Sequence, residues 1–304
     1  MRAITYTEYG DADVLHLEEI AKPEPGEGQV RITVRTVGVN PIDWKVRSGG
    51  MAQGAPLEGT QIPGTEAAGV VDAVGGGVSF AVGDEVFGWT TDGAYAEYVL
   101  ASAASIARKP ETVSWRVAAA LPVAGETALR ALKVLNVSEG DVLLIHGASG
   151  AVGRVATQLA LASGATVVGV GGQGAQDDLT SLGAIPVLYG DGWAGRVREA
   201  APKPVEKVFD AAGYGVLEDS VELVGGKDKV VTIADPAAFG LGITFSAGSA
   251  DEQLAGVLDE IAERVTSGKL AVVLGKDYPL AEAADAQRES ATGHSGGKLT
   301  LSVS

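Results

Sequence analysis

A short apolar segment followed by a glycine-rich turn is the strongest chemical signal in the sequence. The apolar segment, residues 142–146, predicts a β-strand, and the turn after it is Gly147-Ala-Ser-Gly-Ala-Val-Gly153. A helix predicted over Gly150–Ser163 opens from this turn. The first turn of a helix has unpaired N–H groups and a partial positive charge, which favour a phosphate. The arrangement predicts a dinucleotide-binding site, although an ordinary tight strand–helix turn would have the same spacing.

Single positions of this turn have distinct expected roles. Gly150 would let the backbone approach a pyrophosphate, and Gly153 would let the helix pack close to the strand. Ala148, preceded by Gly147, stands where the usual G-x-G-x-x-G pattern has its first glycine. The residues that we expect around the pyrophosphate are Ser149, Gly150, Ala151, Val152 and Gly153.

The end of the second predicted strand, Thr166–Val170, bears on the choice of cofactor. An NAD site usually has Asp or Glu there to bind the ribose hydroxyls. This chain has Gly171, Gly172 and Gln173 instead, so a 2′-phosphate would meet no opposing carboxylate. We therefore expect these three residues to contact NADP, as NADPH. NAD stays open as the alternative, because no Arg or Lys stands there either.

The elements that position this turn indicate two kinds of structure in one chain. Before residue 115, short apolar runs separated by Gly and Pro predict a small β-barrel or sandwich. Trp115–Leu135 predicts helix, interrupted at Pro122. From residue 141, strands and helices alternate, which predicts a doubly wound parallel sheet. Its other strands are expected at Val187–Tyr189, Val205–Asp210 and Lys229–Ile233, and a last helix at Leu254–Val265.

Two of these strands end in small side chains. Ala211 and Ala212 follow one strand, and Ile233 and Ala234 end another. Because the carboxyl ends of strands face the ligand in such a sheet, we expect these residues to leave room for the adenosine and nicotinamide. His146 lies inside the first strand, where we expect it to pack in the core.

Composition limits the classes of function. The formal net charge of -16 disfavours nucleic acid and anionic lipid as partners. No apolar run is long enough for a membrane span, and the acidic start does not resemble a signal peptide, so we predict a cytoplasmic protein. Cysteine is absent, which excludes disulfides, thiolate zinc sites and thiol nucleophiles. The histidines are few and scattered, and we expect no metal site.

Longer motifs along nearly the whole chain resemble one family. In order they are GVNPIDWKVR at 38–47, PGTEAAGVV at 63–71, VGDEVFG at 82–88, GAYAEYV at 93–99, the turn at 147–153, VFDAAG at 208–213 and GHSGGK at 293–298. The chain resembles the zinc-independent quinone oxidoreductase branch of the medium-chain dehydrogenase/reductase superfamily. The resemblance implies an α/β fold, in which a GroES-like β-rich catalytic domain (1–118 and 270–304) contains an inserted Rossmann domain (119–269) with a doubly wound parallel sheet.

The resemblance also bears on metal and reaction. Zinc-dependent relatives have a Cys where this chain has Asn40 and a His where it has Thr65. Glu66 remains, but one carboxylate does not make a tetrahedral zinc site. The resemblance therefore implies hydride transfer from NADPH to a quinone or an α,β-unsaturated carbonyl, without zinc and with little activity on simple alcohols.

The resemblance implies roles for three residues outside the turn. Asn40 is similar to the family's active-site Asn near the nicotinamide ribose and substrate, and Thr127 to a Thr near the nicotinamide. These two are the predicted catalytic residues, and both are also predicted to bind cofactor. Lys298 resembles a tail Lys near the cofactor cleft. The alternatives are a turn Asn before Pro41, a Thr at a helix start and a solvated Lys.

Several points stay open. Some relatives have an Arg where this chain has Gly174, so a preference for NADPH should be modest. A Tyr follows the Asn40 motif in several relatives, whereas Trp44, Val46 and Met51 stand there in this chain, which favours water as the proton source. The alternative functions are an enoyl reductase acting on acyl thioesters and a cofactor-binding protein with a mainly non-catalytic role. The family also implies a homo-oligomer, with a dimer favoured.

Overall fold

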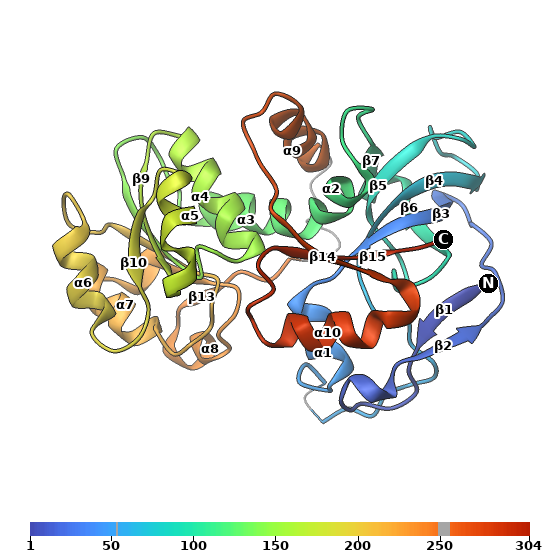
Figure 1. Cartoon of the computed structure of the whole chain (residues 1–304), viewed down its shortest axis with the longest axis horizontal. Helices are drawn as coiled ribbons and strands as arrows, with labels where there is room; N and C mark the ends of the chain where they lie inside the picture. Colours follow the sequence, from blue (N-terminus) through green and yellow to red (C-terminus); the bar gives the residue numbers. More distant parts are fainter. Residues whose placement is uncertain (53, 249–255) are drawn as a thin grey trace. The chain divides into compact units, whose positions relative to one another are not determined.

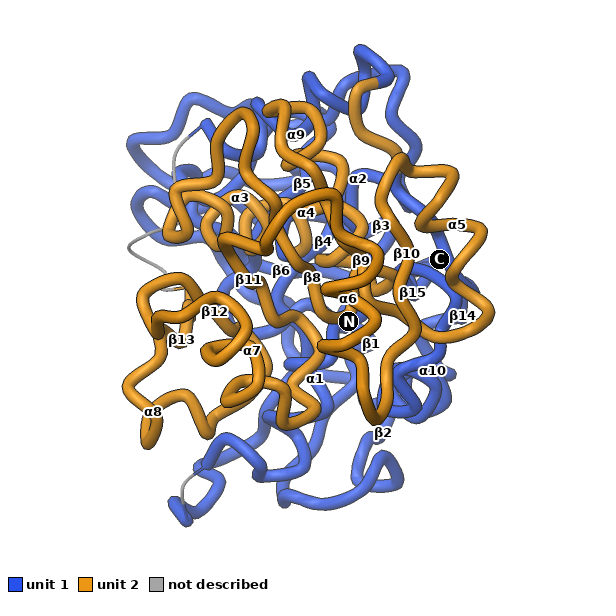
Figure 2. The backbone as a smooth tube through the Cα atoms, turned by 90° about the vertical axis from the view of Figure 1, so that its left-hand side faces the viewer, with its two compact units in different colours: residues 1–123, 254–268, 272–304 blue, residues 124–253, 269–271 orange. Residues whose placement is uncertain are grey.

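The computed structural model describes residues 1–52, 54–248 and 256–304. The chain divides into two compact units (Figure 2). The first unit contains residues 1–123, 254–268 and 272–304, and the second contains residues 124–253 and 269–271. Helix α9 (Val257–Thr266) belongs to the first unit. The limits of 119 and 269 for a Rossmann domain stay a prediction from the sequence.

A seven-stranded sheet organises the first unit (Figure 1). The strands follow the order β14-β15-β3-β4-β5-β7, and β6 pairs with β3. Strands β14 and β15 are parallel, whereas the other neighbours are antiparallel. The strands are β3 (Gln29–Gly38), β4 (Glu66–Val74), β5 (Glu85–Trp89), β6 (Tyr98–Ser102), β7 (Ile106–Arg108), β14 (Leu274–Pro279) and β15 (Lys298–Ser302). The predicted β-rich domain, made from both ends of the chain, is thus confirmed.

Smaller elements complete the first unit. Strands β1 (Arg2–Thr5) and β2 (His16–Glu19) form a separate antiparallel pair. The helices, besides α9, are α1 (Pro41–Arg47), α2 (Trp115–Ala120) and α10 (Ala283–Ala291). Helix α2 packs on β3 and β4, and α10 packs on α1. Buried side chains such as Ile32, Val99 and Leu301 form the core beneath the sheet.

The register of the sheet decides which sequence motifs meet. Strand β3 lies between β15 and β4, with Thr300 opposite Gly38 and Ala67 opposite Val37. The last residues of β3 therefore lie beside the first residues of β4 and of β15. Three motifs that are far apart in the sequence therefore meet where β3 ends and β4 and β15 begin.

A six-stranded parallel sheet organises the second unit (Figure 1). The order is β10-β9-β8-β11-β12-β13, so the chain builds outward from β8 first on one side and then on the other. The strands are β8 (Val142–His146), β9 (Thr166–Gly171), β10 (Ile185–Leu188), β11 (Lys207–Asp210), β12 (Val230–Thr232) and β13 (Thr244–Phe245). This is the predicted Rossmann sheet, and ligands bind such sheets where the order reverses, here between β8 and β11.

Helices cover both faces of this sheet. Figure 1 shows α4 (Ala151–Ala162) and α5 (Gln176–Ser181) against one face, and α6 (Trp193–Ala200) and α7 (Leu217–Val224) against the other. The helices α3 (Pro122–Val134) and α8 (Ala237–Leu241) complete the unit. The strands are hydrophobic on both faces because both faces are covered.

Some elements differ from the sequence prediction. Helices α1 and α10 were not predicted, because each is short and neither has a continuous apolar stripe. Helix α9 begins at Val257, and the first two residues of the predicted helix, 254 and 255, lie outside the described residues. The predicted interruption at Pro122 is confirmed, because α2 ends at Ala120 and α3 begins at Pro122.

Candidate functional site

The glycines at the two ends of the turn after β8 are required by packing within the second unit. Gly147 has a φ of 71°, and a Cβ there would lie 3.2 Å from the backbone of Ala211. A Cβ on Gly153 would lie 2.1 Å from the carbonyl oxygen of Gly147. Only glycine permits these approaches, so both residues set the tight strand–turn–helix geometry.

Gly150 differs from these glycines. It caps α4 in an extended conformation (φ −73°), and a Cβ there would make an ordinary contact of 3.4 Å with the Gly147 carbonyl. The packing of the chain therefore does not require a glycine at this position. A ligand that approaches the backbone would require one.

The N-terminus of α4 presents unpaired donors. The first helical hydrogen bond is donated by the N–H of Arg154 to the carbonyl of Gly150, and no side chain caps the helix. The N–H groups of Ala151, Val152 and Gly153 lie in the first turn, where a helix has no acceptor for them. Together with the helix dipole, they fit the pyrophosphate of a dinucleotide.

Buried hydrogen bonds shape the loops after β11 and β12. The carboxylate of Asp210 accepts from the N–H groups of Ala212 (2.9 Å) and Gly213 (3.0 Å). The hydroxyl of Thr232 accepts from the N–H groups of Ala234 (3.0 Å) and Asp235 (3.1 Å). These bonds fix the two loops that contain the predicted residues Ala211, Ala212, Ile233 and Ala234. Neither Asp210 nor Thr232 is among the site residues predicted from the sequence.

The loop after β9 has no acidic side chain at Gly171, Gly172 or Gln173. The amide of Gln176 donates to the carbonyls of Gly171 (3.2 Å) and Gly172 (2.9 Å), which holds the loop. The ring of Tyr189, which is 63% exposed, lies 3.3 Å from where a Cβ of Gly172 would be. The loop therefore offers backbone groups and one aromatic side chain.

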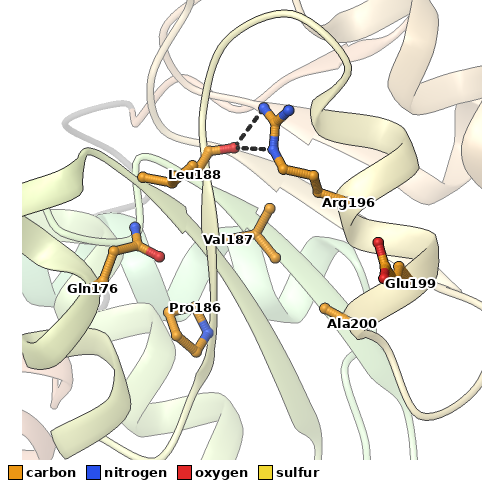
Figure 3. A pocket seen from close by; sticks show the side chains of 7 residues that line it. All are labelled: Gln176, Pro186, Val187, Leu188, Arg196, Glu199 and Ala200. Carbon is orange, nitrogen blue, oxygen red and sulfur yellow. Dashed lines mark hydrogen bonds between the residues drawn. The ribbon is translucent and has the colours of Figure 1, made fainter.

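A pocket of about 430 Å³ lies beside this loop, at the edge strand β10 (Figure 3). Its lining residues are Gln176, Pro186, Val187, Leu188, Arg196, Glu199 and Ala200. The guanidinium group of Arg196 donates to main-chain carbonyls of residues 188–191, including that of Leu188 (Figure 3). Arg196 thus stabilises the loop between β10 and α6. None of the residues predicted to bind cofactor lines this pocket.

Thr127 lies in the middle of α3, so the alternative that it starts a helix is wrong. Its hydroxyl accepts a long bond (3.4 Å) from Arg130. Arg130 also donates to Glu126 (2.6 Å) and to the carbonyl of Ser246 (2.6 Å), directly after β13. Thr127 is therefore held near the carboxyl end of β13 within the second unit.

Asn40 lies in the first unit, between β3 and α1. It occupies the N-cap position of α1, and Pro41 is the first helical residue. Its side-chain Nδ2 donates to Glu66 Oε1 at 2.7 Å. The ammonium of Lys298 donates to Asn40 Oδ1 and, at 2.6 Å, to Glu66 Oε1. Lys298 is buried, so the alternative of a solvated Lys is wrong as well.

The cluster formed by Asn40, Glu66 and Lys298 decides whether this part of the first unit fits zinc. Both oxygens of Glu66 are used, because Oε2 accepts from the N–H of Val123 at 2.7 Å. A Cβ on Gly38 would lie 2.2 Å from Glu66 Oε1, so glycine makes room for the carboxylate. A neutral amide, an ammonium group and an occupied carboxylate do not form a tetrahedral zinc site. Across residues 1–52, 54–248 and 256–304, no three His, Asp or Glu side chains are grouped as metal ligands.

A second buried group adjoins Asn40. The main-chain N–H of Asn40 donates to Asp43 Oδ2 at 2.9 Å, and the Tyr95 hydroxyl donates to the same oxygen at 2.8 Å. Burial, with a smaller contribution from Glu66, raises the pKa of Asp43 to about 7, against the lowering effect of these bonds and of Lys298. Burial also raises the pKa of Tyr95. Tyr95 is not among the site residues predicted from the sequence, since nothing in its local pattern distinguishes it from a core residue.

His146 is a packing residue, as predicted. Its ring packs edge-on against Trp193 with centroids 4.4 Å apart, and burial lowers its pKa to about 4.

No helix in the described part of the chain has the length and apolar character needed to cross a bilayer.

Comparison with known proteins adds to this geometry. Residues 26–111 match the family described as "Alcohol dehydrogenase GroES-like domain", and residues 182–301 match the one described as "Zinc-binding dehydrogenase". The quinone oxidoreductase of Rattus norvegicus is 31% identical, over 98% of this chain and 96% of that protein. The 2-methylene-furan-3-one reductase of Solanum lycopersicum is 33% identical, over 99% of this chain and 79% of that protein. The structure of mycobacterial Rv1454c complexed with NADPH aligns over the full length of both chains, with a TM-score of 0.88 and 30% identity.

Proposed function

Because this chain belongs to the quinone oxidoreductase family of the medium-chain dehydrogenase/reductase superfamily, we propose that it reduces a quinone or an α,β-unsaturated carbonyl without zinc. The protein is an NAD(P)H-dependent oxidoreductase, and its cofactor is NADPH. The choice of acceptor and the roles of single residues are the proposal.

The residues of the second unit fit the cofactor. The unpaired N–H groups at the start of α4 would bind the pyrophosphate, and Gly150 leaves the backbone accessible to it. The loops fixed by Asp210 and Thr232 would flank the adenosine and nicotinamide. Bound NADPH supplies the hydride. We assign Asn40 and Thr127 to placing the nicotinamide and the acceptor.

The Glu66–Lys298 ion pair is the observation that supports this choice of acceptor most strongly. Alcohol oxidation needs a group that stabilises an alkoxide, and the position that holds zinc in other relatives contains Asn40 and an already paired carboxylate. Quinones and enones need less help, because conjugation spreads the arriving charge. Positioning can then supply much of the barrier reduction, since oriented intramolecular reactions gain about 7–11 kcal/mol. We propose that the final proton comes from water.

A steady-state assay tests the proposal. The purified protein would be given NADPH with 1,4-benzoquinone, an enone or crotonyl-CoA, and NADP⁺ with a primary alcohol, each with and without a chelator. We expect turnover with the quinone or the enone, unchanged by the chelator. Alcohol oxidation without quinone or enone reduction would reject the proposal. Turnover with crotonyl-CoA alone would favour the acyl-thioester alternative, and binding of NADPH without any turnover would favour a non-catalytic role.

We also propose a homodimer in the cytoplasm. The edge strand β13 pairs with β12 on one side, and unpaired edges favour association with another chain. Phe239, which is 74% exposed, stacks on Phe245 of this strand with ring centroids 5.1 Å apart. The exposed ring of Phe239, stacked on the half-buried Phe245 beside an edge that no described strand pairs, supports a contact between two copies there.

A further inference from the structure

A buried lysine cation in the first unit makes more contacts than charge neutralisation requires. The side chain of Lys298 is 3% exposed, and that of Glu66 is 0% exposed. Burying a charge costs several kcal/mol unless it is paired, and this pair satisfies the requirement at 2.6 Å. The same ammonium also donates to Asn40 Oδ1. The extra bond connects the ion pair to a predicted catalytic residue.

The two charges select one orientation of the Asn40 carboxamide. Its oxygen accepts from the cation of Lys298, and its nitrogen donates to the anion of Glu66. A flipped carboxamide would place N–H groups against an ammonium and an oxygen against a carboxylate, so both contacts would become repulsive. The main chain of Asn40 is fixed as well, through its bond to Asp43.

This orientation leaves one donor of Asn40 available. A carboxamide nitrogen has two hydrogens, and Glu66 takes one of them. The second hydrogen can donate to an oxygen such as a ribose hydroxyl or the carbonyl of an acceptor. Its direction is set by the Lys298–Glu66 pair, because rotating the carboxamide would break both bonds.

We propose that Lys298 is a positioning residue for the reaction: its ammonium, anchored on Glu66, orients the Asn40 carboxamide without touching cofactor or acceptor. This replaces the direct contact with cofactor expected from the sequence, and it rests on the proposed role of Asn40. In place of a metal ion, the cluster holds a cation that belongs to the chain and acts through an amide.

A double-mutant cycle tests the inference. The variants are Lys298→Met, which shortens the side chain by one atom and removes the charge, Asn40→Ala and the double variant. The measurements are the dissociation constant for NADPH by fluorescence titration, kcat with 1,4-benzoquinone and the melting temperature. We expect Lys298→Met to lower NADPH affinity and kcat by about two- to 150-fold, the range for directly coupled residues. In the Asn40→Ala background, the same change should have almost no further effect.

Two further variants separate positioning from folding. Lys298→Arg keeps the charge and should retain most of the wild-type affinity for NADPH and most of the wild-type kcat. Lys298→Met leaves Glu66 unpaired, so Glu66→Gln/Lys298→Met restores neutrality if the single variant does not fold. That neutral variant should melt near the wild-type temperature and still bind NADPH weakly. Lys276→Met, at an exposed lysine of β14, is the matched control and should change nothing.

The outcomes are distinct. If Lys298→Met lowers NADPH affinity and kcat equally in the wild-type and in the Asn40→Ala background, the inference is overturned, because Lys298 then acts independently of Asn40. Wild-type affinity for NADPH and wild-type kcat in the folded neutral variant would overturn it too. If the wild-type protein reduces neither quinones nor enones, the proposed function fails, whereas the cycle in NADPH affinity still decides whether Lys298 acts through Asn40.

Discussion

The hydroxyl of Thr232 donates to the carboxylate of Asp210 at 2.7 Å, between two completely buried residues at the ends of β12 and β11. Each residue also accepts hydrogen bonds from the N–H groups of the loop that follows its own strand. The pair therefore connects two loops that were predicted, from their small side chains, to flank the cofactor. A second bond, from the Ile233 N–H to the Asp210 carbonyl at 3.0 Å, joins the same two strand ends.

Replacing Thr232 by Val tests this connection. The variant keeps the shape of the side chain but leaves one oxygen of Asp210 and two N–H groups without a partner. We expect the free energy of unfolding to fall by at least about 2 kcal/mol and NADPH affinity to fall with it. Urea denaturation and fluorescence titration measure the two effects.

Thr157→Val is the matched control. Thr157 is equally buried in α4 of the same unit, but its hydroxyl has no hydrogen-bond partner. Its replacement should leave stability unchanged or raise it, because an unpaired buried hydroxyl is unfavourable. A loss of stability at Thr157 as large as that at Thr232 would contradict the role given to the Asp210–Thr232 bond.

The turn glycines should separate binding from folding. Gly150→Val should abolish binding of NADPH and leave the melting temperature near that of the wild type, because a Cβ at Gly150 makes only an ordinary contact of 3.4 Å with the Gly147 carbonyl. Gly153→Ala should instead lower the melting temperature, since its Cβ would lie 2.1 Å from the Gly147 carbonyl. Unchanged affinity in folded Gly150→Val would remove the main support for the pyrophosphate site.

The loop after β9 should control cofactor choice. The wild type is expected to prefer NADPH over NADH modestly, because no carboxylate repels a 2′-phosphate and no Arg binds it. Gly174→Arg should increase this preference, and the structure has room for the change, since a Cβ there meets nothing within 4 Å. Gly174→Gln is the uncharged control. Dissociation constants for both cofactors decide the matter, and a wild-type preference for NADH would contradict the reasoning.

Asp43 should make stability depend on pH. Its pKa is about 7 in the folded chain, against an ordinary value of 3.8 for an aspartate exposed to water, so folding favours the protonated form. The associated stability is fully present below pH 4 and is lost as the pH rises through 7. A shift of this size corresponds to about 4 kcal/mol.

The Asp43→Asn variant isolates this contribution. Its carboxamide oxygen can still accept from the Asn40 N–H and the Tyr95 hydroxyl. We expect the variant to lose less stability than the wild type between pH 5 and pH 8, by urea denaturation at about six pH values. If the free energy of unfolding changes with pH in the same way in both proteins, Asp43 is ionised throughout this range. Lys298 and Glu66, the other charges that act on Asp43, are unchanged in both proteins.

Phe239→Asp tests the proposed dimer contact. A charge on this exposed ring position should disrupt association through the β13 edge and leave the fold of the monomer intact. Light scattering after size-exclusion chromatography measures the mass of both proteins. Val82→Asp, at another exposed apolar side chain, is the control and should leave the mass unchanged. A dimer that persists in Phe239→Asp would place the contact elsewhere.

The strand–turn–helix around Gly150 could be predicted from the sequence because its determinants are local. The apolar run of β8, the glycines of the turn and the small residues of α4 follow one another within about twenty positions, and each element has its own periodicity. The parallel sheet followed in the same way from the alternation of strands and helices. The resemblance implied that residues 270–304 belong to the β-rich domain, but it did not give their neighbours in the sheet.

The arrangement around Asn40 depended on tertiary structure. Asn40 and Lys298 were singled out through a resemblance, yet nothing in the sequence pairs residues 258 positions apart or identifies Glu66 as their common partner. Their meeting follows from the pairing of β15 with β3 and of β3 with β4. That pairing also removes Lys298 from water, and burial turns a lysine that would otherwise be solvated into a fixed charge that orients an amide. The sequence by itself determined the residue types and the local elements; the sheet decided which side chains meet, because burial and pairing are properties of the packed chain.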